Sequence, residues 1–244
     1  MHKNEADYLK QYNIHDYDVP LASVDLAIFT LVEGELQVLL VERGDYPQKG
    51  RWALPGGFVD VRKDKSLEET ATRKLQEKTG VKTPYVEQVC TVGSPTRDPR
   101  GWSLTVVYMA LIGHAPTLAH VEQVKDARWW PWAEARKLNL AFDHRVLLEK
   151  ARERLKSKTA YTALPMFVMR APFTLTGLQR AFEELLEAPL EKKSFRRRIE
   201  EAGLLEEVGE AIPAGGRGRP AALFRPKPSA RGHVFSRILG EGSE

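Results

Sequence analysis

The stretch that decides the fold runs from residue 56 to residue 81. It begins Gly-Gly-Phe-Val-Asp at residues 56–60, continues through a charged loop, and ends Arg-Lys-Leu-Gln-Glu-Lys-Thr-Gly-Val at residues 73–81. Ser66 is a favourable N-cap, and Glu69 three residues later completes a capping box. Gly80 is the residue type that ends helices. The stretch therefore predicts a Gly-Gly turn, a loop, and a helix that runs to Thr79.

This stretch resembles the Nudix box, G-x5-E-x7-R-E-U-x-E-E-x-G-U, in which U is apolar and the glutamates hold divalent cations against a diphosphate. The matching positions are Arg73, Leu75, Glu77, Gly80 and Val81. The glutamate positions that flank Glu77 hold Lys74 and Lys78, and the early glutamate position falls on Lys65 after a loop two residues too long. Hard cations need clustered carboxylate oxygens, which this row cannot supply. The resemblance implies a Nudix fold that keeps its pocket, and the lysines predict no catalytic residue, no bound metal and no cofactor.

Two alternatives to an inactive Nudix pocket stay open. One is an ordinary amphipathic helix with lysines on a solvated face. The other is an active Nudix hydrolase that cleaves ADP-ribose or a similar nucleoside diphosphate derivative, with a metal site rebuilt from Asp60, Asp64, Glu68 and Glu69. Glu68 and Glu69 also lie at the helix N-terminus, where the helix dipole favours anions, and we assign them that role.

Length and composition suit a soluble globular chain with one large or two ordinary domains. The 244 residues are 42% hydrophobic and 29% charged. No apolar run approaches the length needed to span a membrane, and residues 1–5 lack the apolar core of a signal peptide. The single cysteine, Cys90, excludes an intrachain disulfide framework. We expect a cytoplasmic protein with no membrane partner. The net charge of +4 is weak support for nucleic-acid binding, because the placement of charge must decide.

Residues 1–158 are predicted to form an α/β domain of the Nudix type, an α/β/α sandwich with a mixed sheet. Two apolar segments, residues 24–32 and 36–41, flank a short Glu-Gly-Glu turn and predict a hairpin. Asp143 is a candidate cap for a long amphipathic helix that reaches about Ser157. Further strands are expected at residues 52–59, 85–92, 104–112 and 127–130.

Residues 159–244 are predicted to form a second domain of the α+β class with the layout of a winged helix-turn-helix. Its two helices are assigned from apolar residues at helical spacing and from capping residues. The expected elements are a connector at residues 159–172, a helix capped by Thr174 and closed by Pro189, a second helix capped by Ser194 and stopped by Gly203, strands at residues 204–208 and 221–225, and a loose basic tail from Pro226.

The polar loop at residues 94–102, Ser-Pro-Thr-Arg-Asp-Pro-Arg-Gly-Trp, is a candidate ligand-binding element. It resembles the loop that ADP-ribose-acting Nudix enzymes lay over their pocket. Arginine suits a diphosphate because its planar fork donates hydrogen bonds in pairs, and a tryptophan offers a face on which a base can stack. A surface loop with an Asp98–Arg100 ion pair and a core tryptophan is the alternative. The candidate ligand-binding residues are Arg73, Glu77, Arg97, Asp98, Arg100 and Trp102.

Two basic segments of the C-terminal part are candidate DNA-binding elements. Residues 192–198, Lys-Lys-Ser-Phe-Arg-Arg-Arg, open the second helix, with Phe195 and Ile199 on its core side. Arginine in the first turn of such a helix can pair with guanine in the major groove. Residues 215–220, Gly-Gly-Arg-Gly-Arg-Pro, lie where a wing tip could enter a minor groove. A solvated basic face explains either segment alone, but the two together favour DNA. The candidate DNA-binding residues are Lys192, Lys193, Ser194, Arg196, Arg197, Arg198, Arg217 and Arg219.

A degenerate Nudix domain joined to a winged helix resembles the Nudix-related transcriptional regulator (NrtR) family from about Ser23 to Arg225. The most specific segments are residues 92–102, 193–198 and 217–221. The resemblance implies a homodimeric repressor of NAD-metabolism genes, bound to double-stranded DNA at a palindromic operator. Its effector is ADP-ribose or a related NAD metabolite, which releases the DNA. The rival classes are an active Nudix hydrolase, marked by metal-dependent turnover, and an RNA-binding module, marked by preference for structured RNA.

Overall fold

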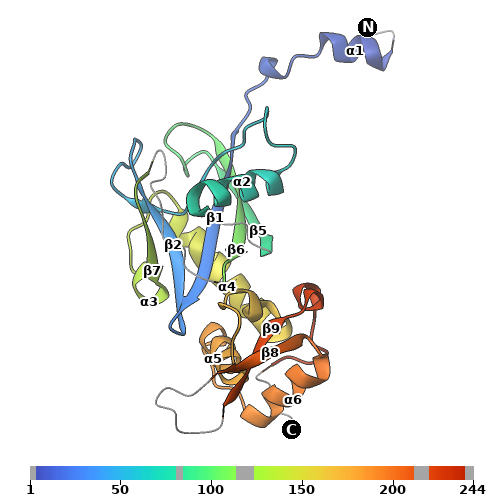
Figure 1. Ribbon diagram of the computed structural model, residues 1–244. Helices are drawn as coiled ribbons and strands as arrows, with labels where there is room; N and C mark the ends of the chain where they lie inside the picture. Colours follow the sequence, from blue (N-terminus) through green and yellow to red (C-terminus); the bar gives the residue numbers. More distant parts are fainter. Residues whose placement is uncertain (1–3, 81–84, 114–123, 212–219, 240–244) are drawn as a thin grey trace.

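The computed structural model describes residues 4–80, 85–113, 124–211 and 220–239. A sheet domain and a smaller helical domain lie end to end, and a short arm extends from the N-terminal side (Figure 1). Val81, Arg217 and Arg219, to which the sequence gives roles, lie outside the described residues.

Within those described ranges, no helix has the length and apolar character needed to cross a lipid bilayer.

A mixed sheet forms the centre of the N-terminal domain, and β1 (Leu21–Val32) lies in its middle. β1 pairs antiparallel with β2 (Glu35–Arg43) and parallel with β6 (Ser103–Leu111). The predicted hairpin is thereby confirmed, with Glu33 and Gly34 at positive φ in its turn. The other strands are β3 (Trp52–Ala53), β4 (Gly56–Phe58), β5 (Tyr85–Ser94) and β7 (Val124–Pro131), in the order β3-β2-β1-β6-β5 with β4 on β1 and β7 on β2.

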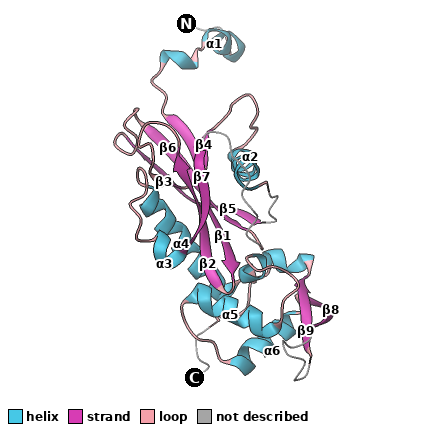
Figure 2. Ribbon diagram, turned by 60° about the vertical axis from the view of Figure 1, so that its left-hand side comes forward, coloured by secondary structure: helices cyan, strands magenta, loops and turns pink. Residues whose placement is uncertain are grey.

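Alternate side chains of β1 serve the two faces of the sheet, as the two-residue period of a strand requires. Leu26 packs in one core with Leu75 of α2 (Leu67–Thr79). Phe29 packs on the other face, which α4 (His144–Tyr161) covers. Helices on both faces, visible in Figure 2, confirm the predicted α/β/α sandwich. The short helix α3 (Trp132–Ala135) joins the α4 layer.

The predicted boundaries of α2 are confirmed by its caps. The Ser66 hydroxyl accepts a hydrogen bond from the Glu69 N–H at 3.1 Å. The Glu69 carboxylate accepts from the backbone N–H of Lys65 at 2.8 Å, one residue earlier than in a standard capping box. Gly80 ends the helix with φ of 68°, in the left-handed region that favours glycine.

The C-terminal domain has the predicted winged-helix layout. α5 (Leu175–Leu186) and α6 (Lys192–Ala202) pack through an edge-to-face contact of Phe182 with Phe195, whose ring centroids are 5.2 Å apart. The Thr174 cap of α5 is confirmed, because its hydroxyl accepts from the Gly177 N–H at 3.0 Å. The strands β8 (Leu205–Ala211) and β9 (Ala221–Pro226) then pair antiparallel.

The structure corrects the predicted cap of α6. Glu191, not Ser194, is the N-cap, and α6 begins at Lys192. The Glu191 carboxylate accepts from the backbone N–H groups of Lys193 and Ser194, at 2.9 and 2.6 Å. A carboxylate satisfies two free N–H groups and also favours the positive end of the helix dipole, so it outcompetes a single hydroxyl.

The predicted strand at residues 52–59 is two strands. Pro55 lies between β3 and β4, and a proline has no N–H to give to a sheet ladder. Its carbonyl instead accepts from the Leu26 N–H at 2.8 Å.

The predicted connector begins later than residue 159, and the predicted loose tail is wrong, because its residues up to Leu239 are packed. α4 continues to Tyr161, and the 3-10 turn Leu164–Phe167 buries its first residues. After a second 3-10 turn, Pro228–Gly232, the Phe235 N–H donates to the Tyr161 carbonyl at 2.7 Å. Phe235 and Leu239 are buried in the winged-helix core. Apolar side chains in the tail therefore close this core, although the tail's overall composition is basic.

Candidate ligand pocket and nucleic-acid interface

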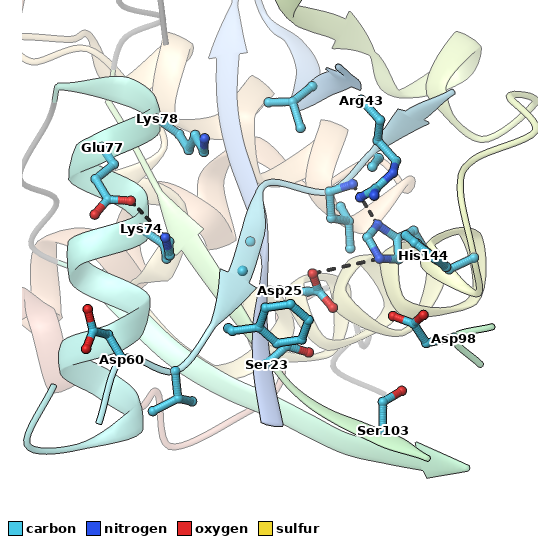
Figure 3. A pocket seen from close by; sticks show the side chains of 18 of the residues that line it. Ser23, Asp25, Arg43, Asp60, Lys74, Glu77, Lys78, Asp98, Ser103 and His144 are labelled. Atoms are coloured by element: carbon cyan, nitrogen blue, oxygen red, sulfur yellow. Dashed lines mark hydrogen bonds and ion pairs between the residues drawn. The ribbon is translucent and has the colours of Figure 1, made fainter. Parts of the chain in front are cut away.

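A cavity of about 1160 Å³ opens between α2 and the N-terminal half of β1 (Figure 3). This volume accommodates a ligand of nucleotide size. The Gly-Gly turn forms part of the wall, and its first glycine is required by a close approach to β1. A Cβ atom on Gly56 would lie 2.4 Å from Oδ1 of Asp25. The glycine therefore lets the backbone of β4 reach the acidic side chain at the bottom of the cavity.

Arg73 ties α2 to the loop before it. Its Nε and Nη2 donate to the two oxygens of Asp64 at 2.7 and 2.5 Å, and its Nη1 donates to Glu77 at 2.9 Å. The Asp64 side chain is only 2% exposed and also accepts from the Thr70 hydroxyl and the Asp60 N–H. The hydrogen bonds from Arg73 hold the pKa of Asp64 well below its usual range. This ion pair fixes the loop against the helix that lines the cavity.

The cavity face of α2 is rich in ammonium groups. Lys74 Nζ donates to Glu77 at 3.0 Å, so both Glu77 oxygens are engaged by cations. Burial alone would raise the pKa of Glu77, but hydrogen bonds from Arg73 and Lys74 outweigh it and lower the pKa. Lys78 is buried, and this burial, with the charge of Lys74 second, lowers the pKa of its ammonium group.

These residues do not fit the divalent cation that a Nudix box implies. Lys74 and Lys78 line the cavity at glutamate positions, and the only matching carboxylate, Glu77, is already paired. Lys65 is exposed in the preceding loop. Across the part of the chain that the structure describes, no group of three or more His, Cys, Asp or Glu side chains is placed to hold a metal ion.

The opposite wall is held by Arg97, whose side chain is 7% exposed. Its Nε and Nη2 donate to the two oxygens of Asp143 at 3.1 and 3.0 Å, and Nη2 lies 3.7 Å from the Asp25 carboxylate. Asp143 occupies the predicted cap position of α4, but its side chain makes no cap hydrogen bond. The predicted cap carboxylate is used instead to fix an arginine of the 94–102 loop.

His144 extends this wall. Its Nδ1 accepts from the Leu54 N–H at 3.0 Å, and its Nε2 lies 3.8 Å from Asp25 Oδ1 (Figure 3). Burial lowers the pKa of His144, against the opposing charges of Asp25 and Asp143. The neutral ring is therefore both a structural acceptor for the β3–β4 segment and a lining group of the cavity.

Asp98 and Arg100 form the ion pair that the sequence analysis gave as the alternative to ligand binding. Both residues also line the cavity. Arg100 donates to the two Asp98 oxygens at 3.0 and 2.6 Å, and its guanidinium lies 5.0 Å from the Phe58 ring centroid. Trp102 is not one of the described residues that line the cavity. Its ring covers Gly93, where a Cβ atom would lie 2.9 Å from it. The stacking of a base on Trp102 stays a prediction.

The predicted ligand-binding set leaves out several polar residues that line the cavity, among them Asp25 and Arg43. One signal for Asp25 was available, because it is a lone acidic residue in the apolar segment that became β1. Arg43 had no such signal, whereas the place of His144 directly after the cap residue Asp143 already allowed it to line the pocket rim. The sheet and α4 bring Arg43 and His144 to the same cavity from distant parts of the chain.

The first two turns of α6 separate their cations into exposed and packed groups. Arg197 is 70% exposed, and Lys192 and Lys193 are also exposed. Arg196 donates to the Thr176 hydroxyl of α5 at 3.2 Å. Arg198 donates to the carbonyl of Ile238 at 2.7 Å and so holds the C-terminal segment. Phe195 and Ile199 are buried, as predicted.

Both domains of this chain match families of known proteins. The NUDIX domain family matches residues 23–151, and the NrtR DNA-binding winged helix domain family matches residues 165–225. The ADPR responsive transcriptional repressor NtrR of Acinetobacter baylyi is 50% identical over 222 residues, which cover 91% of this chain and 88% of that protein. The chain belongs to the NrtR family.

Solved NrtR structures are similar over both domains. Shewanella oneidensis NrtR complexed with a 27mer DNA is 47% identical, covers 89% of this chain and 99% of its own, and has a TM-score of 0.82. The NUDIX domain of the same NrtR, complexed with ADP ribose, is 49% identical, covers 62% of this chain and 99% of its own, and has a TM-score of 0.60. The cavity described above lies in the NUDIX region of the NrtR fold, and α6 lies in its winged-helix region.

The Arg73–Asp64 pair predicts a specific acid dependence of stability. The folded pKa of Asp64 is depressed, so its stabilisation is present above the ordinary aspartate pKa and is lost as pH falls below it. Asp64→Asn should lower stability at pH 6 and flatten its decline between about pH 5 and pH 3. Urea denaturation across this range measures both effects. Asp126→Asn removes an exposed carboxylate of β7 and is the control. A wild-type acid slope retained in Asp64→Asn would contradict the assignment.

Proposed function

We propose that this NrtR protein is an ADP-ribose-responsive transcriptional repressor of NAD-metabolism genes. The observation that carries the proposal is the lysine-rich wall of α2, in a chain that also presents exposed cations on α6. A pocket that binds without cleaving is a sensor, and a basic winged helix is an output. The Acinetobacter and Shewanella relatives, by their names and bound molecules, support the pairing of ADP-ribose with DNA.

The α2 wall accounts for binding without hydrolysis. Two ammonium groups, Lys74 and Lys78, carry the same charge as one divalent cation and can neutralise a diphosphate. They cannot replace the metal's catalytic role, because an ammonium group has no open coordination position at which to lower the pKa of a water molecule. The residues of the proposed site are those predicted from the sequence. Arg73 and Glu77 order α2, and the 94–102 loop, which carries Arg97, Asp98, Arg100 and Trp102, binds the ligand.

Arg100 is better placed than Arg97 for direct diphosphate contact. The Nε and Nη2 atoms of Arg97 both donate hydrogen bonds to Asp143, and the Arg97 side chain is almost wholly buried. Arg100 is paired with Asp98 but remains 42% exposed at the cavity. In the proposal Arg97 positions the loop, and Arg100 rearranges its pairing to meet the ligand.

The DNA-binding half of the proposal rests on the first two turns of α6. Lys192, Lys193 and Arg197 are exposed there, and arginine at such a position pairs bidentately with guanine. Ser194, Arg196 and Arg198 complete the predicted set on α6. Arg217 and Arg219 remain the proposed wing contacts.

The proposed assembly is a homodimer on a palindromic operator, because a two-fold protein matches two half-sites. Residues 1–158 act as the sensor and residues 159–244 as the DNA-binding unit. Ligand must bind one dimer arrangement better than the other, since only differential affinity shifts an equilibrium.

ADP-ribose should weaken operator binding by about 5- to 150-fold, the usual range of coupling between two sites. Fluorescence anisotropy with DNA from the protein's own upstream region measures this shift. Calorimetry should find ADP-ribose affinity reduced by the same factor when operator is present, because linkage is reciprocal. Ribose 5-phosphate, which lacks the diphosphate, is the control ligand. Equal ADP-ribose affinities with and without operator would remove it as the effector.

The protein is also expected not to hydrolyse ADP-ribose. Incubation with ADP-ribose and Mg²⁺ or Mn²⁺ should release no AMP at the rate of an ordinary enzyme, which is about 1 per second or faster. The reason is the lysine substitution of the carboxylate row on α2. A Lys74→Glu, Lys78→Glu double variant tests whether these lysines prevent hydrolysis, because it restores two carboxylates beside Glu77. Turnover in the wild type at an enzymatic rate would favour the hydrolase alternative instead.

Arg197→Ala should narrow the gap between operator and random DNA by about 1–3 kcal/mol, the worth of a bidentate base contact. Arg145→Ala, an exposed arginine of α4 in the sheet domain, is the matched control and should bind like wild type. Salt titration separates the roles, because loss of a phosphate contact lowers the salt slope by about one unit and leaves selectivity intact. Unchanged selectivity in Arg197→Ala would remove this residue from base recognition.

A further inference from the structure

The floor of the cavity carries a buried carboxylate that accepts no hydrogen bond from the described residues. Asp25 of β1 lines the cavity with a side chain that is 9% exposed. Its ion-pair neighbours are Arg97, whose Nη2 lies at 3.7 Å, and His144, whose Nε2 lies at 3.8 Å. Both distances exceed that of a hydrogen bond. Because a buried carboxylate is costly without hydrogen bonds, Asp25 is an acceptor that a ligand can satisfy.

Asp25 differs in this respect from the other carboxylates that line the cavity. Asp60, Glu77 and Asp98 each form an ion pair with a neighbouring cation. Asp45 is exposed, so water hydrates it. Within the described lining of the cavity, Asp25 is therefore the carboxylate that is both buried and left without a hydrogen-bond donor.

The arginines near Asp25 are committed to other acceptors. Arg97 donates through Nε and Nη2 to Asp143, at 3.1 and 3.0 Å. Arg43, which also lines the cavity, donates through Nε to the Pro47 carbonyl at 2.8 Å. The positive charges of these arginines lower the cost of burying the Asp25 carboxylate, but their hydrogen bonds go elsewhere.

His144 places a hydrogen-bond donor beside this acceptor. Burial lowers the pKa of His144, so the ring is neutral at physiological pH and carries one hydrogen. Its Nδ1 accepts from the Leu54 N–H at 3.0 Å, so the hydrogen is on Nε2. That Nε2 lies 3.8 Å from Oδ1 of Asp25, and the two side chains point toward one another (Figure 3). The floor therefore presents a donor and an acceptor side by side.

A ligand hydroxyl group is the chemical complement of this pair. One oxygen atom at about 2.8 Å from both His144 Nε2 and Asp25 Oδ1 fits the 3.8 Å gap between them. A hydroxyl oxygen accepts one hydrogen bond and donates another. A phosphate oxygen has no hydrogen to donate to Asp25 and is repelled by its charge, and an ammonium group cannot accept from Nε2–H.

The surroundings of the pair suit a sugar. Ser23 lies two residues before Asp25, on the same face of β1, and both line the cavity. Ser103 adds a second hydroxyl to the lining. These groups and the α2 lysines come from different elements of the fold (Figure 3). The cavity therefore offers cations for a diphosphate and a separate polar floor for hydroxyl groups.

We propose that Asp25 and His144 bind one sugar hydroxyl of the ligand, which accepts from His144 Nε2–H and donates to the Asp25 carboxylate. The inference rests on the proposed function and adds the sugar to the diphosphate that the α2 lysines are proposed to bind. In ADP-ribose this hydroxyl belongs to the terminal ribose or to the adenosine ribose, and truncated ligands distinguish the two.

Calorimetry with ADP-ribose and truncated ligands tests the pair. Asp25→Ala should weaken ADP-ribose binding roughly 10- to 150-fold, the worth of a hydrogen bond to a charged group. The effect of Asp25→Ala should disappear with one of two ligands. The methyl ester of ADP lacks the terminal ribose, and an ADP-ribose without the 2′ and 3′ hydroxyls lacks those of the adenosine. Asp126→Ala removes an exposed carboxylate outside the cavity lining and is the matched control.

His144→Asn tests the donor. Asparagine keeps an oxygen acceptor for the Leu54 N–H but has no counterpart of Nε2–H. The variant should weaken ADP-ribose binding roughly 2- to 12-fold, the worth of a neutral hydrogen bond, and should lose its effect with the same truncated ligand as Asp25→Ala. Nitrogen-15 NMR of the wild-type imidazole needs no variant and should show the hydrogen on Nε2. A hydrogen on Nδ1 would overturn the proposal.

Three binding results would also contradict the assignment. Equal losses in Asp25→Ala for ADP-ribose and both truncated ligands would make Asp25 a structural residue. An Asp25 effect that disappears when hypoxanthine replaces adenine would place a base edge, not a sugar, on the floor. Either result overturns this inference and leaves the proposed effector standing. Wild-type protein that binds no ADP-ribose would instead overturn the effector, and the inference with it.

Discussion

The two halves of this protein are coupled by one helix that belongs to two hydrophobic cores. Leu178 and Phe182 of α5 lie in the winged-helix core, whereas Leu185 of the same helix is completely buried in the core of the sheet domain. Glu184 adds a polar contact, because its carboxylate accepts from the Leu36 N–H at 3.1 Å. A helix whose buried side chains are divided between two cores cannot turn relative to either domain without losing burial. The winged-helix domain is therefore packed on the sheet domain through contacts of α5 with α4 and β2.

The charge pattern on α2 decides what the cavity can do. The Arg73–Asp64 ion pair holds the loop before α2 against this helix. With that frame held, the lysines present positive charge to the cavity without the open coordination sites of a metal. At the positions where a Nudix box has glutamates, this scaffold places two ammonium groups, Lys74 and Lys78, on the cavity wall, and the proposed binding of a diphosphate without cleavage rests on that difference.

Not all charges in a basic segment have the same role. On α6, Arg196 and Arg198 use their hydrogen bonds to hold α5 and the C-terminal segment, whereas Arg197 extends into solvent. The ion pair of Asp98 with Arg100 and the burial of Arg97 divide the 94–102 loop in a similar way. In both segments a few cations stabilise the fold, and the neighbours that they position remain available for a ligand.

Local sequence determined the hairpin at β1 and β2, the capped helix α2, the two helices of the winged helix and the lysines of the cavity wall. Each depends on neighbours within a few residues: a turn, a cap, or an apolar period. Tertiary structure alone decided that Asp143 binds Arg97 rather than capping α4, and that His144 reaches the cavity beside Asp25. It also decided that the basic tail closes a core. These outcomes depend on contacts between segments that are far apart in the chain. A buried polar side chain bonds to the group that the fold places beside it, and the local sequence does not show which group that is.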